Sequence, residues 1–393
     1  MERIWNKHKQ SNNTPLKRKV FVGVSGGVDS SVALALLQKQ GYDVTGVFLK
    51  VWNPDWLPCD WKEERRSAMR VCATLGVPFL TFDFEKEYKK EVVDYMIREY
   101  SSGRVPNPDV FCNKYVKFGV FLKKMRELGA DYIATGHYAQ IFPDVRLRES
   151  LRDSLSRTSG EFELRESVDK EKDQSYFLYT LGQYELSHTL FPVGGMTKPE
   201  VRKLAKEFGL PTAEKKDSQG LCFIGKVDMK DFLSHYIKTK SGNVLNTNGE
   251  IIGNHDGALF FAVGQRHGFT ITKKSPDDPR YFVISKDLEK NTITVANKES
   301  ENDAVYNIKE IMLKNLHLIS PQGLSLGKGF LRCLVRIRYH QEKQNCTVDK
   351  KSDGYHIVFD KPQNAISVGQ SAVLYQGDIC LGGGIIDKVS FNS

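Results

Sequence analysis

Cysteine is sparse in this sequence, and no two cysteines form a C-x-x-C pair. The count is seven, an odd number, in a chain of 393 residues. Low density and wide spacing argue against a secreted disulfide framework, a zinc ribbon and a closely spaced iron–sulfur motif. We therefore expect a reducing cytoplasm and no tightly bound metal or iron–sulfur cluster. Any functional cysteine is expected to act as a thiol.

Long apolar runs are also lacking. No stretch approaches the roughly 18 residues that a membrane span requires, so no membrane partner is expected. The amino-terminal segment MERIWNKHKQSNNTPLKRK has no apolar core of the kind found in secretory signals. Its shortage of acidic residues keeps an organellar presequence open as the alternative to a cytoplasmic location.

Basic residues outnumber acidic ones, by 57 Lys and Arg to 48 Asp and Glu, which gives a formal net charge of +9. An excess of this sign suits an anionic partner, of which nucleic acid is the most common. A basic enzyme without such a partner explains this number equally well.

The first half of the chain alternates between two apolar patterns. Short apolar runs predict strands, and amphipathic stretches between them predict helices. The strands are expected at 20–24, 43–49, 77–84 and 130–138, and the helices at 31–40, 62–76, 85–100 and 112–128. This alternation predicts an α/β fold with a parallel sheet covered on both faces. Ligands of such sheets bind beyond the carboxyl ends of the strands. Those ends are followed here by Ser25–Asp29, Lys50–Trp52 and Thr135–Tyr138.

The rest of the chain divides into segments that differ in composition and residue pattern. Residues 144–171 are charged and Ser-rich and are expected to be an inserted loop, and 172–208 are expected to be rich in helix. After about residue 227 the pattern changes to short strands separated by turn residues. We therefore predict a catalytic domain at 1–226, a small, mostly β domain at 227–302 and a β-barrel at 303–393.

The segment SGGVDSS, residues 25–31, lies between the first strand and the first helix. It lacks the Lys-Ser/Thr pair of a Walker A loop. Gly26 and Gly27 nevertheless allow close approach of the backbone, and the start of the helix favours an anion. Asp29 makes sense beside phosphate if Mg²⁺ bridges the two. The alternative is a plain turn in which Asp29 caps the helix.

Two cysteines lie in unusual surroundings. Cys112 follows Asn107, Pro108 and Asp109, and its expected place at the start of a helix would favour a thiolate. Asp109 is placed to handle a proton. Cys222 lies in a glycine-flanked loop among lysines. The other five cysteines are expected to be small buried hydrophobic residues.

The strand expected near residue 335 alternates with period two. One face would carry Arg332, Arg336, Arg338 and His340, and the other Cys333, Val335, Ile337 and Tyr339. A basic face suits phosphate contact, whereas a solvated barrel exterior explains Arg332 and Arg336 equally well.

SGGVDSS resembles the PP-loop of the ATP pyrophosphatase superfamily, which binds ATP while the α-phosphorus is attacked. The chain as a whole resembles the tRNA-specific 2-thiouridylase family. Segments that carry this resemblance occur in order along nearly the whole sequence: PNPDVFCNK, ATGHYA, KDQSYFL, DSQGLCFIG, VGQRHG, RIRYHQ and GQSAVLYQGDICLGGGII.

The resemblance implies a role for each matching residue. ATP would be bound by Gly23, Val24, Ser25, Gly26, Gly27, Val28, Asp29, Ser30, Leu49 and Gly136. The target base would be surrounded by Asn107, Pro108 and Asp109. Cys112 would be the nucleophile and Cys222 would carry a persulfide. Contacts with tRNA would come from His137, Lys172, Asp173, Gln174, Arg338, Tyr339 and Gln370.

The implied reaction uses ATP and Mg²⁺ to adenylate the wobble uridine of tRNA (Lys, Glu and Gln isoacceptors) and then replaces its 2-oxygen by sulfur. A sulfur-relay protein would supply the persulfide, and a monomer is expected. Three alternatives remain: an amidating PP-loop synthetase, a different tRNA sulfurtransferase, and a non-catalytic RNA-binding protein that keeps the ATP fold.

Overall fold

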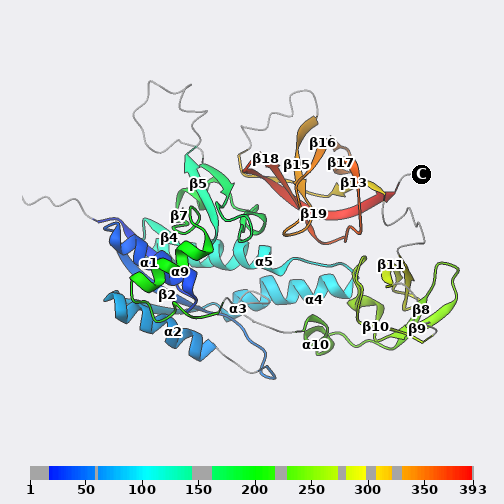
Figure 1. Ribbon diagram of the computed structural model, residues 1–393, viewed down its shortest axis with the longest axis horizontal. Helices are drawn as coiled ribbons and strands as arrows, with labels where there is room; N and C mark the ends of the chain where they lie inside the picture. Colours follow the sequence, from blue (N-terminus) through cyan, green and yellow to red (C-terminus); the bar gives the residue numbers. More distant parts are fainter. Residues whose placement is uncertain are drawn as a thin grey trace, which may run out of the picture.

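The structure is a computed structural model that describes residues 17–57, 61–143, 162–216, 228–272, 280–297, 307–320 and 330–391. Figure 1 shows a helix-covered sheet at one end and two β-rich units at the other. Cys59, Cys222 and residues 144–161 of the expected insertion lie outside the described ranges. None of the helices within those ranges is long and apolar enough to cross a membrane.

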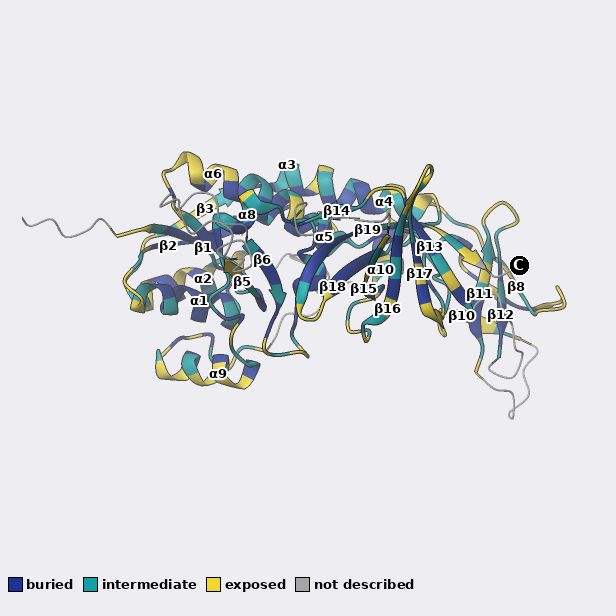
Figure 2. Ribbon diagram, turned by 90° about the horizontal axis from the view of Figure 1, so that it is seen from above, coloured by how far each residue is buried: buried dark blue, intermediate teal, exposed yellow. Residues whose placement is uncertain are grey.

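The first sheet is parallel, as expected from the alternating pattern. Its five strands follow the order β3-β2-β1-β4-β7. They span Lys19–Gly23 (β1), Asp43–Lys50 (β2), Phe79–Asp83 (β3), Tyr132–Ala134 (β4) and Thr189–Leu190 (β7). Strands β1 and β2 are buried over most of their length, because helices cover both faces of a sheet of this kind. The buried strands appear dark blue in Figure 2.

Most of the helices belong to this first unit. They span Val28–Lys39 (α1), Trp61–Leu75 (α2), Glu85–Tyr88 (α3), Asp94–Ser101 (α4), Pro108–Phe111 (α5), Leu122–Glu127 (α6), Gln183–Ser187 (α8), Lys198–Glu207 (α9) and Met229–Ser234 (α10). Two π-helical stretches, Lys89–Val93 (η1) and Cys112–Phe121 (η2), continue neighbouring helices, and Ser175–Phe177 (η3) and Ala258–Phe260 (η4) are 3₁₀ turns.

The helix expected at 112–128 begins four residues earlier than predicted. Asn107 is its N-cap and accepts a hydrogen bond from the Val110 N–H at 3.4 Å, and Pro108 occupies the first turn. Proline is favoured there because its missing N–H would have no partner anyway. Cys112 therefore lies beyond the first turn, and its own N–H donates to the carbonyls of Pro108 and Asp109.

The middle unit contains a five-stranded sheet in the order β10-β9-β8-β12-β11. Its strands span Gly242–Leu245 (β8), Ile251–His255 (β9), Phe269–Ile271 (β10), Phe282–Asp287 (β11) and Thr292–Ala296 (β12). A small apolar cluster that includes Val244, Val283 and Ile293 forms its core.

The carboxyl-terminal unit is a closed β-barrel, as predicted. Its strands span Ile308–Leu313 (β13), His317–Leu318 (β14), Phe330–Arg336 (β15), Gln344–Lys351 (β16), Gly354–Gln363 (β17), Ser371–Gln376 (β18) and Ile379–Phe391 (β19). Strand β13 pairs with both β17 and β19, which closes the ring. In β15 Cys333 and Val335 are buried and Arg332 is exposed, which confirms the predicted alternation over these residues, but the strand ends at Arg336, so Arg338 and His340 lie in the turn that follows and not on a strand face.

The expectation of an irregular insertion over 144–171 is wrong at its carboxyl-terminal end. Phe162–Glu166 forms a strand, β6, that pairs with Ala139–Pro143, β5. Strand β6 also pairs with β19, where Leu164 lies opposite Cys380. Backbone hydrogen bonds to partner strands thus order a short charged segment in which only Phe162 and Leu164 are apolar. This hairpin joins the first unit to the barrel in one continuous sheet.

Candidate functional site

The loop after β1 has the backbone that a phosphate ligand requires. Gly26 has φ +80°, and a Cβ there would lie 2.5 Å from the Glu64 carbonyl oxygen. Gly27 is the N-cap of α1 in extended conformation. A side chain at Gly26 would be strained by the positive φ and would also clash with Glu64. The first N–H groups of α1 therefore face a loop that contains no bulky side chain, which is the arrangement that binds anions.

Serine hydroxyls hold this loop from within. Ser31 donates to the Gly27 carbonyl at 2.7 Å, and Ser30 donates to the same carbonyl at 3.2 Å. The Ser25 N–H in turn donates to the Ser30 hydroxyl at 3.2 Å. Both Ser30 and Ser31 are buried, whereas Ser25 is exposed. The loop is thus held in part by its own serines, and the Gly26 carbonyl also accepts a hydrogen bond from the more distant Ser67 at 3.0 Å.

A second loop completes this edge of the sheet. A Cβ on Gly136, just after β4, would lie 2.5 Å from the Ser30 backbone nitrogen, so this loop packs directly on the first turn of α1. Leu49, at the end of β2, is 6% exposed and lies next to Gly23. The predicted ATP-binding residues are therefore brought together at the carboxyl edge of the parallel sheet.

Asp29 has partners that the sequence did not indicate. Its two carboxylate oxygens lie 2.7 and 2.9 Å from the Lys198 ammonium, and the Tyr138 hydroxyl donates to Oδ1 at 2.8 Å. Lys198 comes from the start of α9, more than 160 residues away in sequence. The motif TKPE does predict a helix start at Thr197, but not the direction in which this lysine points.

The residues around Asp29 fit only one kind of magnesium site. No group of three or more His, Cys, Asp or Glu side chains gathers to hold a metal ion in the described part of the chain. Magnesium commonly takes one carboxylate and completes its shell with phosphate oxygens and water. A lone carboxylate that already accepts hydrogen bonds from a lysine fits an ion delivered with a nucleotide, and it does not fit a resident metal centre.

Lys215 connects the segment before Cys222 to the loop after β1, residues 24–27, which we call the phosphate loop because phosphate is its predicted ligand. Its ammonium donates to the Gly26 carbonyl at 3.1 Å and forms an ion pair with Glu64 at 2.7 Å. After Cys222 in the sequence, the His235 ring stacks on the Trp56 ring, with the two ring centroids 3.7 Å apart. Both flanks are therefore anchored to the first unit, although Cys222 itself lies outside the described residues.

The loop that precedes α5, residues 103–107, is held by the barrel. The Val105 N–H donates to the Val368 carbonyl at 2.9 Å, and Gln370 donates to the Val105 carbonyl at 3.1 Å. Arg104 forms ion pairs with Glu99 at 2.8 Å and with Asp387 at 3.0 Å. We call residues 103–107 the base loop, because the predicted base-contacting residues start at its end. Gln370, predicted to contact tRNA, is thus also a support of this loop.

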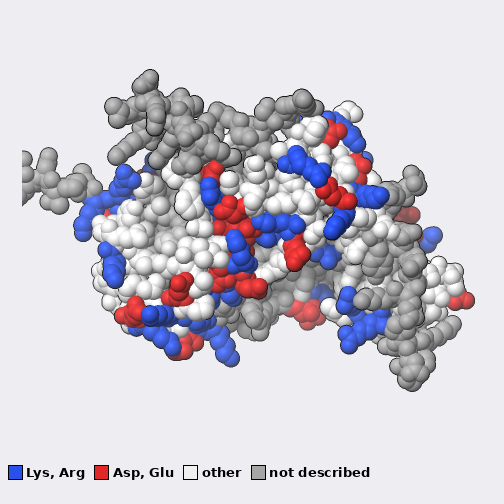
Figure 3. All heavy atoms as spheres, turned by 45° about the horizontal axis from the view of Figure 1, so that its top comes forward, with Lys and Arg blue, Asp and Glu red and all other residues white. Residues whose placement is uncertain are grey.

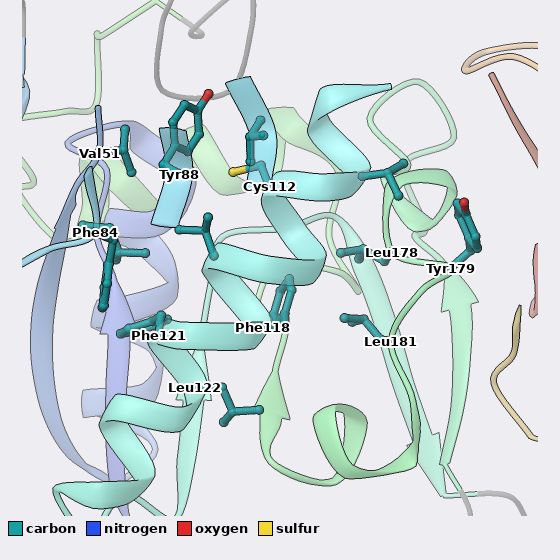
Figure 4. Packing of buried hydrophobic residues seen from close by; sticks show 14 of the residues in the cluster. Val51, Phe84, Tyr88, Cys112, Phe118, Phe121, Leu122, Leu178, Tyr179 and Leu181 are labelled. Atoms are coloured by element: carbon teal, nitrogen blue, oxygen red, sulfur yellow. The ribbon is translucent and has the colours of Figure 1, made fainter. Parts of the chain in front are cut away.

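Cys112 is fully buried, and it lies beyond the first turn of its helix rather than at the helix start that was expected to favour a thiolate. It belongs to a large apolar cluster with Tyr88 and Phe118. Figure 4 shows its sulfur turned toward Tyr88, on the side where Val51 also lies. Val51 follows β2 at the carboxyl edge of the sheet, so Cys112 is close to that edge but covered. The remaining cysteines in the described ranges, Cys72, Cys333, Cys346 and Cys380, are buried as predicted.

His137 connects the two regions. It contacts the Thr135 hydroxyl through Nδ1 at 2.7 Å and the Lys117 ammonium through Nε2 at 3.3 Å. Burial, together with the positive charge of Lys117, holds the pKa of His137 well below its usual value. The neutral imidazole is therefore the form present at pH 7.

The residues predicted to bind tRNA differ in their exposure. Asp173 is buried, where it accepts hydrogen bonds from Ser167 and Ser175 and pairs with Arg336 at 3.2 Å. Desolvation raises its pKa. Gln174 bonds to both backbone groups of Tyr138, at 2.8 and 3.0 Å. Lys172 and Tyr339 are half-buried, and Arg338 is exposed and donates to the Ala365 carbonyl.

Arg336 does not present its charge to solvent as a basic strand face would. It pairs with Glu166 and Asp173, both buried, at 3.2 Å, and Lys343 joins Glu166 at 2.9 Å. This cluster lies at the junction of the β5–β6 hairpin and the barrel. On the face in Figure 3, basic and acidic side chains are intermixed, so the positive excess does not form one uniform patch there.

The fold and the site together define a class: an α/β protein with a PP-loop-like phosphate site, joined to two β units. Three family descriptions match in order along the chain. They are "tRNA methyl transferase HUP domain" at residues 18–226, "tRNA methyl transferase PRC-barrel domain" at 230–297 and "Aminomethyltransferase beta-barrel domain" at 308–386.

Relatives identify the family more closely. A tRNA-specific 2-thiouridylase MnmA from Geobacillus kaustophilus is 42% identical over 97% of this chain and 98% of its own length. Proteins of the same name from Pseudomonas paraeruginosa and Francisella tularensis are 41% and 43% identical, over 96% and 94% of this chain and 96% and 99% of theirs. The chain belongs to the tRNA-specific 2-thiouridylase family.

Proposed function

We propose that this protein is an ATP-dependent tRNA sulfurtransferase that makes 2-thiouridine at the wobble position of tRNA for Lys, Glu and Gln. The observation that carries the proposal is the joining of two sites in one unit. These are the phosphate loop with Asp29 and the helix that begins after Asn107 and contains Cys112. The contact between His137 and Lys117 links them. The names of relatives at 41–43% identity support tRNA as the substrate and 2-thiouridine as the product, and the wobble position and the isoacceptors are part of the proposal.

The first step is transfer of AMP to the uridine. The phosphates of ATP lie against Gly26, Gly27 and the first N–H groups of α1, which stabilise negative charge. The uridine O2 attacks the α-phosphorus, the bond to the bridging oxygen breaks, and pyrophosphate leaves. Mg²⁺ bound with the nucleotide and held by Asp29 would neutralise phosphate charge. The barrel supports the base loop, which would position Asn107, Pro108 and Asp109 around the base.

The second step exchanges oxygen for sulfur. A sulfur-relay protein supplies a persulfide on Cys222, and its terminal sulfur attacks C2 of the adenylated uridine and expels AMP. The Cys112 thiolate then attacks the Cys222 sulfur. The sulfur–sulfur bond breaks, the thiocarbonyl remains on the base, and a Cys112–Cys222 disulfide forms. A cellular thiol reductant must reduce this disulfide before the next turnover. Because Cys112 is fully buried, its cover must move for this step.

The test is a thiolation assay on unmodified tRNA. Purified protein is incubated with ATP, Mg²⁺, a persulfide donor and tRNA, and the digested tRNA is analysed for 2-thiouridine. We expect Cys112→Ser and Cys222→Ser to lose at least about 100-fold in rate, since neither hydroxyl can take part in thiol–disulfide exchange.

Cys333→Ser is the matched control, because Cys333 is buried in β15 of the barrel, in an apolar cluster separate from those that contain Cys112 and Val24. It is expected to keep the rate within a few-fold. Full activity in both Cys112→Ser and Cys222→Ser would refute the thiol assignments. Release of AMP and pyrophosphate with incorporation of nitrogen rather than sulfur would instead identify an amidating synthetase.

A further inference from the structure

The buried lysine at the start of α9 is the feature that the reaction outlined above leaves unused. Lys198 is 8% exposed, and its ammonium lies 2.7 and 2.9 Å from the two oxygens of Asp29. Its position is unlike that of the other lysines on the same helix. Lys203 and Lys206 have side chains that are 78% and 62% exposed and pair with surface glutamates.

Local physics opposes the placement of Lys198. A lysine in the first turn of a helix meets the positive end of the helix dipole, and burial of an ammonium costs solvation free energy. The helix start itself is secured by Thr197 and Glu200, whose side chains form a capping box. Helix formation therefore does not require a buried cation here, and its role has to be sought at Asp29.

Asp29 lies in the first turn of α1, two residues after Gly27. A carboxylate at this position repels incoming phosphate oxygens, which carry the same sign of charge. The Lys198 ammonium cancels that charge, and the Tyr138 hydroxyl fixes the same carboxylate oxygen at 2.8 Å. The Asp29 side chain remains 31% exposed, so the ion pair reaches the surface on which the phosphates would lie.

We propose that Lys198 is a phosphate-binding residue, which shares its ammonium between Asp29 and the β- and γ-phosphates of ATP. This inference rests on the proposed function, because it takes ATP as the ligand of the phosphate loop. An ammonium carries several donors on one nitrogen, so it can contact a carboxylate and a phosphate oxygen together. The contact would stabilise ATP and the departing pyrophosphate, but not AMP.

The test compares nucleotides that differ only in phosphate number. Dissociation constants for ATP, pyrophosphate and AMP are measured by calorimetry in Mg²⁺ buffer, without tRNA, for wild type and for Lys198→Met. We expect ATP and pyrophosphate to bind about 10- to 100-fold more weakly, the range of one charge-assisted hydrogen bond. AMP affinity is expected to change less than about threefold.

Lys203→Met is the matched control on the same helix, and all three affinities are expected to stay at the wild-type value. Where Lys198→Met does not fold, as judged by circular dichroism, Lys198→Arg serves instead. That variant keeps the positive charge. Its dissociation constant for ATP is expected to stay within about tenfold of the wild-type value, and the ratio of its ATP and AMP dissociation constants is expected to change.

Equal weakening of ATP and AMP would assign Lys198 a structural role only, and an unchanged ATP affinity would remove it from the site. Either result overturns the inference. Both are distinct from a failure of the proposed function, which would appear as a lack of 2-thiouridine with the wild-type protein whatever its ATP affinity.

Discussion

The loop after β1 is held by its own serines and by Ser67 and Lys215 of the same unit, whereas the base loop is held by the barrel, through its β17–β18 loop and β19, at least 263 residues away. In the first loop, Ser30 and Ser31 donate to the Gly27 carbonyl, and Ser67 and Lys215 donate to the Gly26 carbonyl, so these partners all belong to the first unit. In the second, Val368, Gln370 and Asp387 from the barrel supply the partners.

This difference predicts which changes would affect ATP binding and which would affect tRNA binding. A nucleotide site made within the first unit can form as soon as that unit folds. A base site made from the barrel forms only when the carboxyl-terminal unit has docked. We therefore expect changes in the phosphate loop to affect ATP directly, and changes at the barrel junction to affect tRNA alone.

The largest effect is expected from Gly26→Ala, which tests the construction of the phosphate loop within the first unit. A methyl group there has both an unfavourable φ and a contact 2.5 Å from the Glu64 carbonyl oxygen. We expect ATP affinity to fall by at least about 100-fold and the free energy of unfolding to fall by about 1–3 kcal/mol. Calorimetry and denaturant unfolding measure the two quantities.

Gly41→Ala separates the two causes, because Gly41 also has a positive φ, +89°, but no atom within 4 Å of an added Cβ. It is expected to lose stability through strain alone and to keep full ATP affinity. If Gly26→Ala bound ATP normally, the loop would not be the phosphate site.

A smaller effect is expected from Arg104→Met at the barrel junction. This change removes ion pairs to Glu99 and Asp387 whose side chains are 18% and 28% exposed. We expect kcat/KM for tRNA to fall about tenfold and stability to fall by about 1–3 kcal/mol, while ATP affinity is unchanged. Steady-state thiolation kinetics and ATP calorimetry provide the comparison.

The control is Arg66→Met, which breaks an exposed ion pair with Glu63 on α2. It should lower the free energy of unfolding by about 0–1 kcal/mol and leave kcat/KM for tRNA unchanged. A parallel loss of ATP affinity in Arg104→Met would show that the two loops are not built independently.

The smallest effect concerns His137, which lies between the two regions. Its pKa is lowered well below the usual 6.5, first by burial and then by Lys117. The unfolded chain therefore binds a proton more readily than the folded one. Stability is full above about pH 6.5 and falls as pH drops toward the folded pKa, by at most about 1.4 kcal/mol per pH unit.

His137→Gln should remove this part of the pH dependence between about pH 6.5 and pH 5, as measured by denaturant unfolding at a series of pH values. Asn248→Gln, at an exposed position without a titratable group, should leave the slope unchanged. An identical slope in wild type and His137→Gln would mean that the imidazole becomes protonated without cost in the fold.

Much of this arrangement was predictable from short stretches of sequence. Apolar runs located β1 and β2, the two glycines located the phosphate loop, and period-two alternation located the buried side of β15. The start of the Cys112 helix was misplaced because Pro108 was taken for a loop residue rather than the first residue of a helix. Strand β6 was missed because its order comes from β5 and β19 and not from its own composition.

The amino-acid sequence by itself determined the parallel sheet, the barrel and the family of this protein, since each depends on local periodicity or on contiguous motifs. Only the tertiary structure decided which charges meet. It paired Asp29 with Lys198, turned Arg336 inward to Asp173 and buried Cys112. The physical reason is that an ion pair depends on distance in space and on exclusion of water, and neither is encoded by the spacing of residues along the chain.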